Sequence, residues 1–245
     1  MTTVGKNNTL SRVKRLKELF DSGAIKKTHL HEVHPDLPRE DRINYVYYTL
    51  PVSINYQRSS PAMWRSALET YHDPETQYLF YPERTARTPL EKVRTDLGKH
   101  RLGLQINRHT NIWMALSQTF ASDYDADPRR FLEECRYDVE YIIHTLRTTK
   151  KKKFPYLSGP KMANYWLYIL HLYTDIPLIH LDQISIIPDT HVQQASRFLG
   201  ITTEKAPPDQ TAEAWSVLLE GSGIRPIDMH PVLWNWSREG FMPKV

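Results

Sequence analysis

Apolar side chains recur every three or four residues through most of the chain, which is the spacing of helices with one buried face. This spacing predicts helices over 9–20, 41–50, 108–120, 161–173, 189–199, 211–220 and 231–237. The longest predicted helix begins at Asp127-Pro128 and carries its apolar stripe over 131–146. No segment alternates apolar and polar residues over enough positions to predict a sheet. The pattern therefore predicts an all-α fold.

Glycines and prolines mark several helix ends. Gly23 and Gly200 follow predicted helices, and Pro51 stops the helix over 41–50. The segment 88–91, Thr-Pro-Leu-Glu, has the pattern of a capping box and starts a further helix that ends at Gly98. The segment 174–188 holds prolines and β-branched residues, and we expect an ordered loop there.

The composition is that of a globular protein, because 40% of the 245 residues are hydrophobic. The longest apolar stretch, 165–172, is too short to span a bilayer. Residues 1–8 lack the apolar core of a signal peptide, so we expect a cytoplasmic protein without a membrane partner. Cys135 is the single cysteine, which excludes an internal disulfide and a cluster held by several thiolates.

Positive charge is unevenly distributed, although the net charge is only +4 and the pI is near 9.0. It concentrates over 12–17, at 26–27 and in the run Lys150, Lys151, Lys152 and Lys153. Such a run is most often a solvated surface segment. Its place directly before the turn described next makes contact with DNA phosphates the competing interpretation.

The segment 154–164, Phe-Pro-Tyr-Leu-Ser-Gly-Pro-Lys-Met-Ala-Asn, lies between two predicted helices. A tight turn containing glycine between two helices is a helix-hairpin-helix pattern, here spanning 138–173. Gly159 permits close approach of the backbone to a phosphate, and the start of the second helix favours an anion. We therefore predict DNA backbone contacts at Leu157, Ser158 and Gly159.

A second motif follows 28 residues after Lys161, where Asp189-Thr190-His191-Val192 opens another predicted helix. Together with Gly-Pro-Lys-Met-Ala-Asn at 159–164, it resembles the signatures of the helix-hairpin-helix/GPD superfamily of DNA glycosylases. In endonuclease III-like members a Gly-x-Lys-x-Ala-Asn hairpin precedes an Asp-Thr-His-Val segment. Both motifs occur here in the same order.

Further segments resemble the archaeal 8-oxoguanine branch of that superfamily, which also has a longer connection between the two motifs. They are Ser-Ile-Asn-Tyr-Gln at 53–57, Gln-Ile-Asn-Arg at 105–108, and Ser-Gly-Ile-Arg-Pro at 222–226 with Val-Leu-Trp at 232–234. The resemblance covers roughly residues 40–240. His230 stands where that branch places a base-contacting aspartate, and Asp228 is out of register.

The resemblance implies which residues would carry out base excision. Lys161 would be the amine nucleophile and Asp189 the catalytic carboxylate. A lysine attacks only as the free amine, so we expect burial and the helix N-terminus to favour the neutral form. Gln57, His230 and Trp234 would line the base pocket, and Arg108 would contact DNA.

Simpler interpretations exist for each of these residues. Lys161 is compatible with a surface lysine in a first helical turn, and Asp189 with an N-cap. Gln57 suits a pocket, a wedge or the surface equally. Trp234 is at a spacing typical of the core, and Arg108 of an ion pair. His29, His31 and His34 lack the carboxylate or thiolate spacing of a metal site, so we expect no metal and no cofactor.

We expect one helix-hairpin-helix unit over 1–245 with two helical lobes, one over about 50–150 and the other from the terminal segments, without an iron-sulfur cluster. The predicted function is a base-excision glycosylase and abasic-site lyase that acts as a monomer on double-stranded DNA containing a damaged base, most simply 8-oxoguanine. The alternatives are an oxidised pyrimidine, uracil or an alkylated base as target, a non-catalytic DNA-binding module, and an all-α interaction domain.

Overall fold

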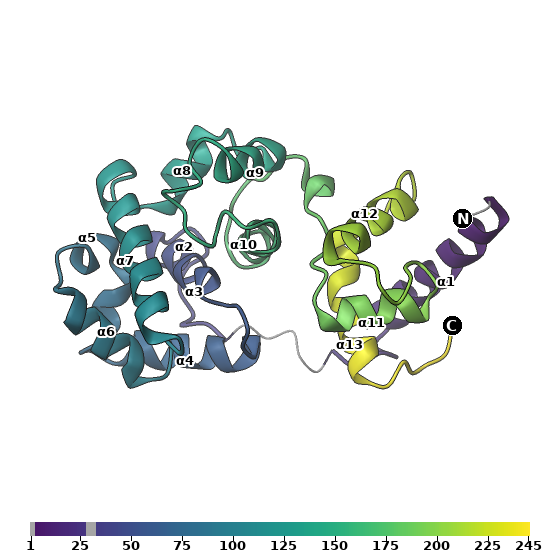
Figure 1. Ribbon diagram of the computed structural model, residues 1–245, viewed down its shortest axis with the longest axis horizontal. Helices are drawn as coiled ribbons and strands as arrows, with labels where there is room; N and C mark the ends of the chain where they lie inside the picture. Colours follow the sequence, from purple (N-terminus) through teal and green to yellow (C-terminus); the bar gives the residue numbers. More distant parts are fainter. Residues whose placement is uncertain (1–2, 28–32) are drawn as a thin grey trace. The chain divides into compact units, whose positions relative to one another are not determined.

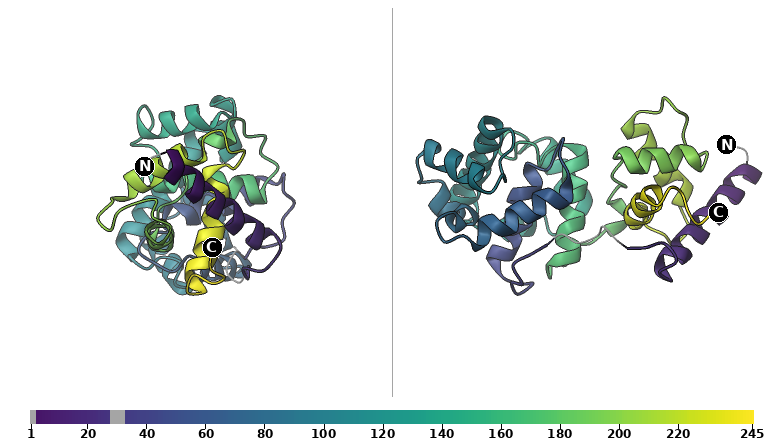
Figure 2. Two further views of the ribbon diagram at one scale, coloured as in Figure 1. Left: turned by 90° about the vertical axis from the view of Figure 1, so that its right-hand side faces the viewer. Right: turned by 90° about the horizontal axis from the view of Figure 1, so that it is seen from below.

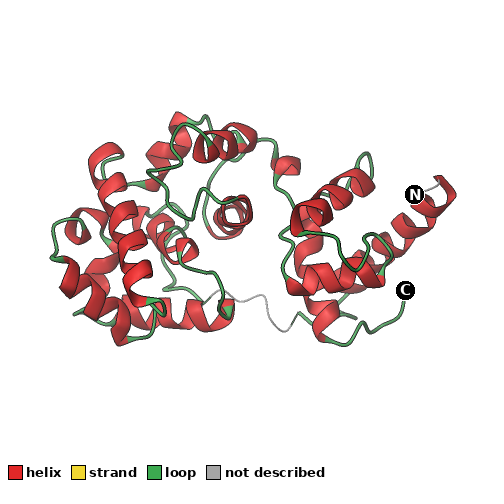
Figure 3. Ribbon diagram, viewed as in Figure 1, coloured by secondary structure: helices red, strands yellow, loops and turns green. Residues whose placement is uncertain are grey.

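The computed structural model describes residues 3–27 and 33–245, and helices dominate this part of the chain (Figures 1 and 3). Clustering of contacts divides it into two compact units, one of Met1–Leu30 with Leu181–Val245 and the other of His31–His180. In the described residues the β-structure is a single isolated bridge, between Asp138 and Ile179. The predicted all-α fold is therefore confirmed.

The described residues of the unit His31–His180 form nine α-helices, and the unit is longer than the lobe predicted over about 50–150. The arrangement of the whole chain as one two-lobed glycosylase stays a prediction. The helices are α2 (Arg42–Tyr47), α3 (Leu50–Ser53), α4 (Ser60–His72), α5 (Pro82–Thr85), α6 (Leu90–Lys99), α7 (Ile106–Asp123), α8 (Pro128–Glu134), α9 (Val139–Arg147) and α10 (Pro160–Tyr173), with a 3-10 turn η1 (Gln77–Phe80).

Buried aromatic side chains form the core of this unit, and two of its tryptophans also join distant segments by hydrogen bonds. Trp113 Nε1, on α7, donates to the Leu79 carbonyl at 3.0 Å. Trp166 Nε1, on α10, donates to Thr49 Oγ1 at 2.9 Å. Satisfied indole N–H groups let such large rings be buried without an unpaired donor. The core therefore fixes α10, which carries Lys161, against the α2–α3 region.

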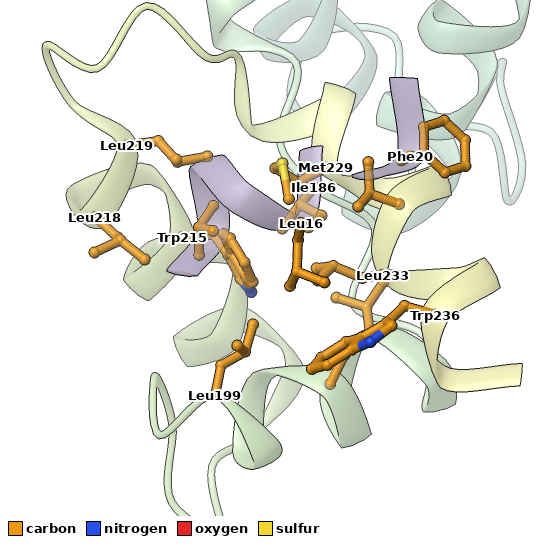
Figure 4. Close-up of a cluster of buried hydrophobic side chains, with 14 of the residues drawn as sticks. Leu16, Phe20, Ile186, Leu199, Trp215, Leu218, Leu219, Met229, Leu233 and Trp236 are labelled. Carbon is orange, nitrogen blue, oxygen red and sulfur yellow. The ribbon is translucent and has the colours of Figure 1, made fainter. Parts of the chain in front are cut away.

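The other unit packs α1 (Thr3–Asp21) with α11 (Thr190–Phe198), α12 (Pro208–Leu219) and α13 (Met229–Arg238), and includes the 3-10 turns η2 (Leu181–Gln183) and η3 (Pro226–Asp228). Helix α13 contacts both α11 and α1 (Figure 2). The apolar core of this unit includes Leu16, Trp215, Leu233 and Trp236 (Figure 4). Trp215 Nε1 donates to Ser196 Oγ at 2.8 Å, which ties α12 to α11.

The longest predicted helix is wrong as a single element, because the chain breaks between α8 and α9. Arg136 and Tyr137 both adopt φ of 56°, a left-handed backbone that no α-helix contains. Asp138 then caps α9 by accepting from the Tyr141 amide at 3.0 Å. The Tyr137 carbonyl accepts from the Ile179 amide at 3.0 Å, so a distant strand-like contact holds the break.

Two further predictions about helix ends are wrong. Thr88 does not cap α6, since its Oγ1 donates to the Arg84 carbonyl at 2.9 Å; Pro89 precedes the helix instead. The helix expected over 41–50 is divided into α2 and α3, with Pro51 in the first turn of α3, where proline leaves no amide unpaired. Helix α4 lies in a region for which the sequence predicted no helix.

Candidate active site

The hairpin between α9 and α10 is closed by its own backbone. The amides of Leu157, Ser158 and Gly159 donate to the carbonyls of Pro155, Phe154 and Tyr156 at 2.8, 3.0 and 3.0 Å. A Cβ at position 159 would lie 3.2 Å from the Tyr156 carbonyl, so this turn favours glycine. Leu157 is fully buried and Ser158 nearly so. These residues shape the turn, and their contact with DNA stays a prediction.

The first two amides of α10 after Pro160 have no hydrogen-bond partner among the described residues. Pro160 has no N–H, and the amides of Lys161 and Met162 donate to no described residue. Open amides at the start of the 14-residue helix α10 point along its positive end. An anion is the natural partner for such a pair of amides.

Lys161 itself is exposed, so the burial expected for its side chain is not found in the chain alone. No carboxylate of a described residue pairs with it, in contrast to Lys150 and Lys153. One turn further along α10, the Tyr165 hydroxyl accepts from Trp64 Nε1 at 3.1 Å and lies 3.2 Å from Ser60 Oγ. Residues four apart share a helix face. Lys161 therefore lies on the side of α10 that faces the start of α4.

Asp189 belongs to the other unit, where it is the N-cap of α11. Its Oδ1 accepts from the Val192 amide at 2.9 Å. No described residue donates to Oδ2, which leaves one carboxylate oxygen for other chemistry. The N-cap predicted for Asp189 is therefore present. The pairing of Lys161 with Asp189 stays a prediction, because each unit is described by itself.

Two of the predicted pocket residues share a helix, and one of them contacts the Asp189 motif. His230 and Trp234 lie one turn apart on α13. The ring of His191, two residues after Asp189, meets Trp234 edge to face at 5.2 Å between centroids. The Arg238 guanidinium lies 5.1 Å from the Trp234 ring. Asp228 is engaged by Arg225 through two 2.8 Å hydrogen bonds.

Gln57 is not in that unit and instead accompanies an exposed leucine. It is exposed, with φ of 51°, and its Oε1 accepts from Gln105 Nε2 at 3.1 Å. Leu104, next to Gln105, is 48% exposed. Sequence analysis missed Leu104; the available signal was an apolar residue after Gly103 and before a helix start, outside any helical stripe. Together they present one polar and one apolar side chain from adjoining loops.

Positive charge without acidic partners surrounds these loops. Arg58 donates to the carbonyls of Leu102 and Arg101 at 2.6 and 3.2 Å. None of Arg58, Arg101 and Arg108 pairs with a carboxylate of a described residue. Burial and the charge of Arg101 lower the pKa of Arg58 to about 10. Burial, Arg58 and Arg108 lower the pKa of His109 to about 4. The ion pair expected for Arg108 is therefore absent from the described part of the chain.

Comparison with solved structures finds a similar fold. The structure of a trapped endonuclease III–DNA covalent intermediate superimposes with a TM-score of 0.59, covering 98% of this chain and 88% of that one. The chain shares the endonuclease III fold. The two sequences are 17% identical, so the likeness establishes the fold alone. No protein-family profile matches the chain, and neither does any curated protein sequence.

Within this endonuclease III fold, two members of the lysine run are engaged. Lys150 pairs with Glu134 at 2.7 Å and with the Tyr124 hydroxyl, and Lys153 pairs with Asp123. Lys151 and Lys152 are exposed and have no such partner in the described part of the chain. An ion pair inside the protein competes with a phosphate for the same ammonium. Lys151 and Lys152 are therefore the members of the run that suit DNA contact.

The described residues were also compared with what a metal site or a membrane span would require. The residues described contain no cluster of three or more histidine, cysteine or acidic side chains able to hold a metal. His29 and His31 lie outside these residues, and His34 Nδ1 accepts from the Asp36 amide at 3.2 Å. No helix of the described chain is long and apolar enough to cross a bilayer.

Proposed function

We propose that this chain is a DNA glycosylase with abasic-site lyase activity and that Lys161 is its nucleophile. The observation that carries the proposal is the placement of Lys161. It stands exposed and without a carboxylate partner among the described residues, in the first turn of α10, directly after the hairpin. The solved counterpart of this fold is a covalent endonuclease III–DNA intermediate.

In the proposed reaction, the lone pair of Lys161 Nζ forms a bond to C1′ of the damaged nucleotide as the bond from C1′ to the base breaks. The base leaves with a proton. Opening of the sugar ring then gives an imine between Nζ and C1′, and loss of a C2′ proton expels the 3′ phosphate.

Asp189 suits the role of the carboxylate in this reaction. Oδ1 is used by the cap, which fixes the side chain, and Oδ2 is open to stabilise positive charge on the sugar. A charge held by its own helix cap needs no reorganisation when the substrate arrives. We propose that Asp189 acts on the same nucleotide that Lys161 attacks.

The described charges support DNA as the partner. The open amides of Lys161 and Met162 would bind one backbone phosphate. Arg58, Arg101 and Arg108 would attract the backbone on either side of Gln57 and Leu104. An exposed leucine beside a glutamine suits insertion into the base stack, where the damaged base must leave its place.

The decisive experiment is borohydride trapping on DNA that carries a preformed abasic site. We expect wild type to form a protein–DNA adduct and Lys161→Gln to form none while it still binds the duplex. Lys205→Gln is the matched control, because it removes an exposed lysine that lies outside the hairpin and outside the residues proposed to contact DNA. Retained binding with no adduct from wild type would favour the non-catalytic DNA-binding module. An undiminished adduct from Lys161→Gln would assign the reaction to another amine.

The base we propose is 8-oxoguanine, with His230 and Trp234 in its pocket. We assign Gln57, which was predicted for the same pocket, to insertion beside Leu104 instead. A neutral imidazole donates one hydrogen bond and accepts another, whereas a carboxylate only accepts. His230 would therefore read a different edge of the base from an aspartate. Duplexes with 8-oxoguanine, uracil, an oxidised pyrimidine or an alkylated base, tested on wild type and His230→Asp, decide the substrate. Excision of another base alone would refute 8-oxoguanine and leave Lys161 in place.

A further inference from the structure

A stack of two tyrosines links the hairpin to the loop that carries Gln57. The rings of Tyr56 and Tyr156 lie 4.7 Å apart at an interplanar angle of 13°. Tyr156 is in the hairpin turn itself, with φ of 63°, and its carbonyl accepts the Gly159 amide at 3.0 Å. The hairpin is thus in contact with a residue 100 positions earlier in the chain.

Arg108 lies against the same stack. Its guanidinium carbon is 4.5 Å from the ring centroid of Tyr156 and 5.1 Å from that of Tyr56. A guanidinium held on aromatic faces keeps its N–H edges available for a phosphate, because the ring contact uses only the flat face. The stack therefore joins three segments, the Gln57 loop, the start of α7 and the hairpin.

From Tyr56 the contacts branch to both exposed side chains. The Tyr56 hydroxyl donates to Gln105 Oε1 at 3.2 Å, and Gln105 Nε2 donates to Gln57 Oε1 at 3.1 Å. The buried ring of His109 meets Tyr56 edge to face at 5.3 Å, and His109 Nδ1 accepts from the Leu104 amide at 3.1 Å. Tyr56 thus reaches the side chain of Gln57, the next residue in the chain, through Gln105, and the backbone of Leu104 through His109.

We propose that Tyr56 and Tyr156 are positioning residues that hold Gln57 and Leu104 at a fixed place relative to the hairpin that would bind the DNA backbone. This inference rests on the proposed function. Pushing a base out of the stack requires that the inserting side chains stay fixed relative to the bound backbone. If the loops that carry Gln57 and Leu104 could move away from the DNA, they would move instead of displacing the base. The stack, rooted in the hairpin, prevents this movement.

The proposal separates two reactions that use the same Lys161. Excision of a damaged base requires the base to be extruded first, which costs several kcal/mol. Imine formation at a preformed abasic site has no base to extrude. Loss of the stack should therefore slow excision and leave abasic-site trapping almost unchanged. A merely structural defect would lower both.

The test compares full-length wild type with Tyr156→Phe, Tyr156→Leu and Tyr56→Phe. Phenylalanine at 156 keeps the stack and the Arg108 contact, whereas leucine removes both. Phenylalanine at 56 keeps the stack and removes the hydroxyl that holds Gln105. Tyr141→Leu is the control, because Tyr141 is 51% exposed on α9 and outside this network. The readouts are the single-turnover excision rate, the fluorescence of 2-aminopurine at the target position, and the rate of borohydride trapping on abasic DNA.

We expect Tyr156→Leu to lower the excision rate and the 2-aminopurine signal by about tenfold, from the loss of one aromatic pair and one cation–π contact. Its trapping rate should stay within about threefold of wild type, because an abasic site holds no base that must be extruded. Tyr156→Phe should restore excision. Equal loss of excision and trapping, or no loss of either, would overturn the positioning role. Absence of trapping in wild type would instead refute the proposed function.

Discussion

Lowering the pH from 7 to 5 should destabilise the unit that contains His109, and this residue should account for a defined part of the loss. His109 is 1% exposed, and its Nδ1 accepts from the Leu104 amide, which requires the neutral ring. Burial, Arg58 and Arg108 lower its pKa from 6.5 to about 4. The unfolded chain therefore binds a proton in this pH range that the folded chain does not.

The size of the effect follows from the two pKa values. The stabilisation by the neutral ring is fully present above pH 6.5 and is lost as the pH falls from 6.5 toward 4. At 1.36 kcal/mol per pKa unit, the free energy of unfolding should fall by about 2 kcal/mol at pH 5 and by about 3 kcal/mol at pH 4. Other histidines contribute to the pH dependence of the whole protein, so a difference measurement is needed.

His109→Asn supplies that difference, because an asparagine oxygen can accept from the Leu104 amide and does not titrate. Urea unfolding of both proteins, followed by circular dichroism between pH 7.5 and about pH 5, gives the two free energies. Their difference should be constant above pH 7 and should shrink as the pH falls. A difference that is flat with pH, or an NMR titration of His109 near pH 6.5, would refute the reasoning.

Three further outcomes are expected. Asp189→Ala should lower the free energy of unfolding by about 1 kcal/mol and Asp189→Asn by a few tenths, while both should lose base excision; a wild-type rate for Asp189→Asn would reduce Asp189 to a cap. Neutralising Lys151 and Lys152 should flatten the salt dependence of DNA binding by about 0.9 log unit per lost contact, measured by fluorescence anisotropy, whereas Lys150→Gln should change it less. Trp215→Phe should destabilise by about 2 kcal/mol through the lost Nε1–H bond to Ser196 Oγ and the lost volume, and an unchanged melting temperature would contradict this.

Elements that depend on neighbours in sequence were predictable from the sequence alone. Pro160 after Gly159 places the start of α10, because proline suits the first helical turn and the glycine fits the tight hairpin turn. Asp189 caps α11 through an amide only three residues away. The all-α fold and the hairpin between two helices follow from such local rules and from the period of the apolar positions.

Tertiary contacts decided what local rules could not. The break between α8 and α9 depends on Ile179, more than 40 positions from Arg136, and the apolar stripe runs through the break without a signal. Lys150 and Lys153 look identical to Lys151 and Lys152 in the sequence, and only Glu134 and Asp123 distinguish them. Tyr56 and Tyr156 meet because two loops are folded against each other. Charge pairing and ring stacking act through space, so the sequence shows which groups are present, and only the fold determines which of them meet.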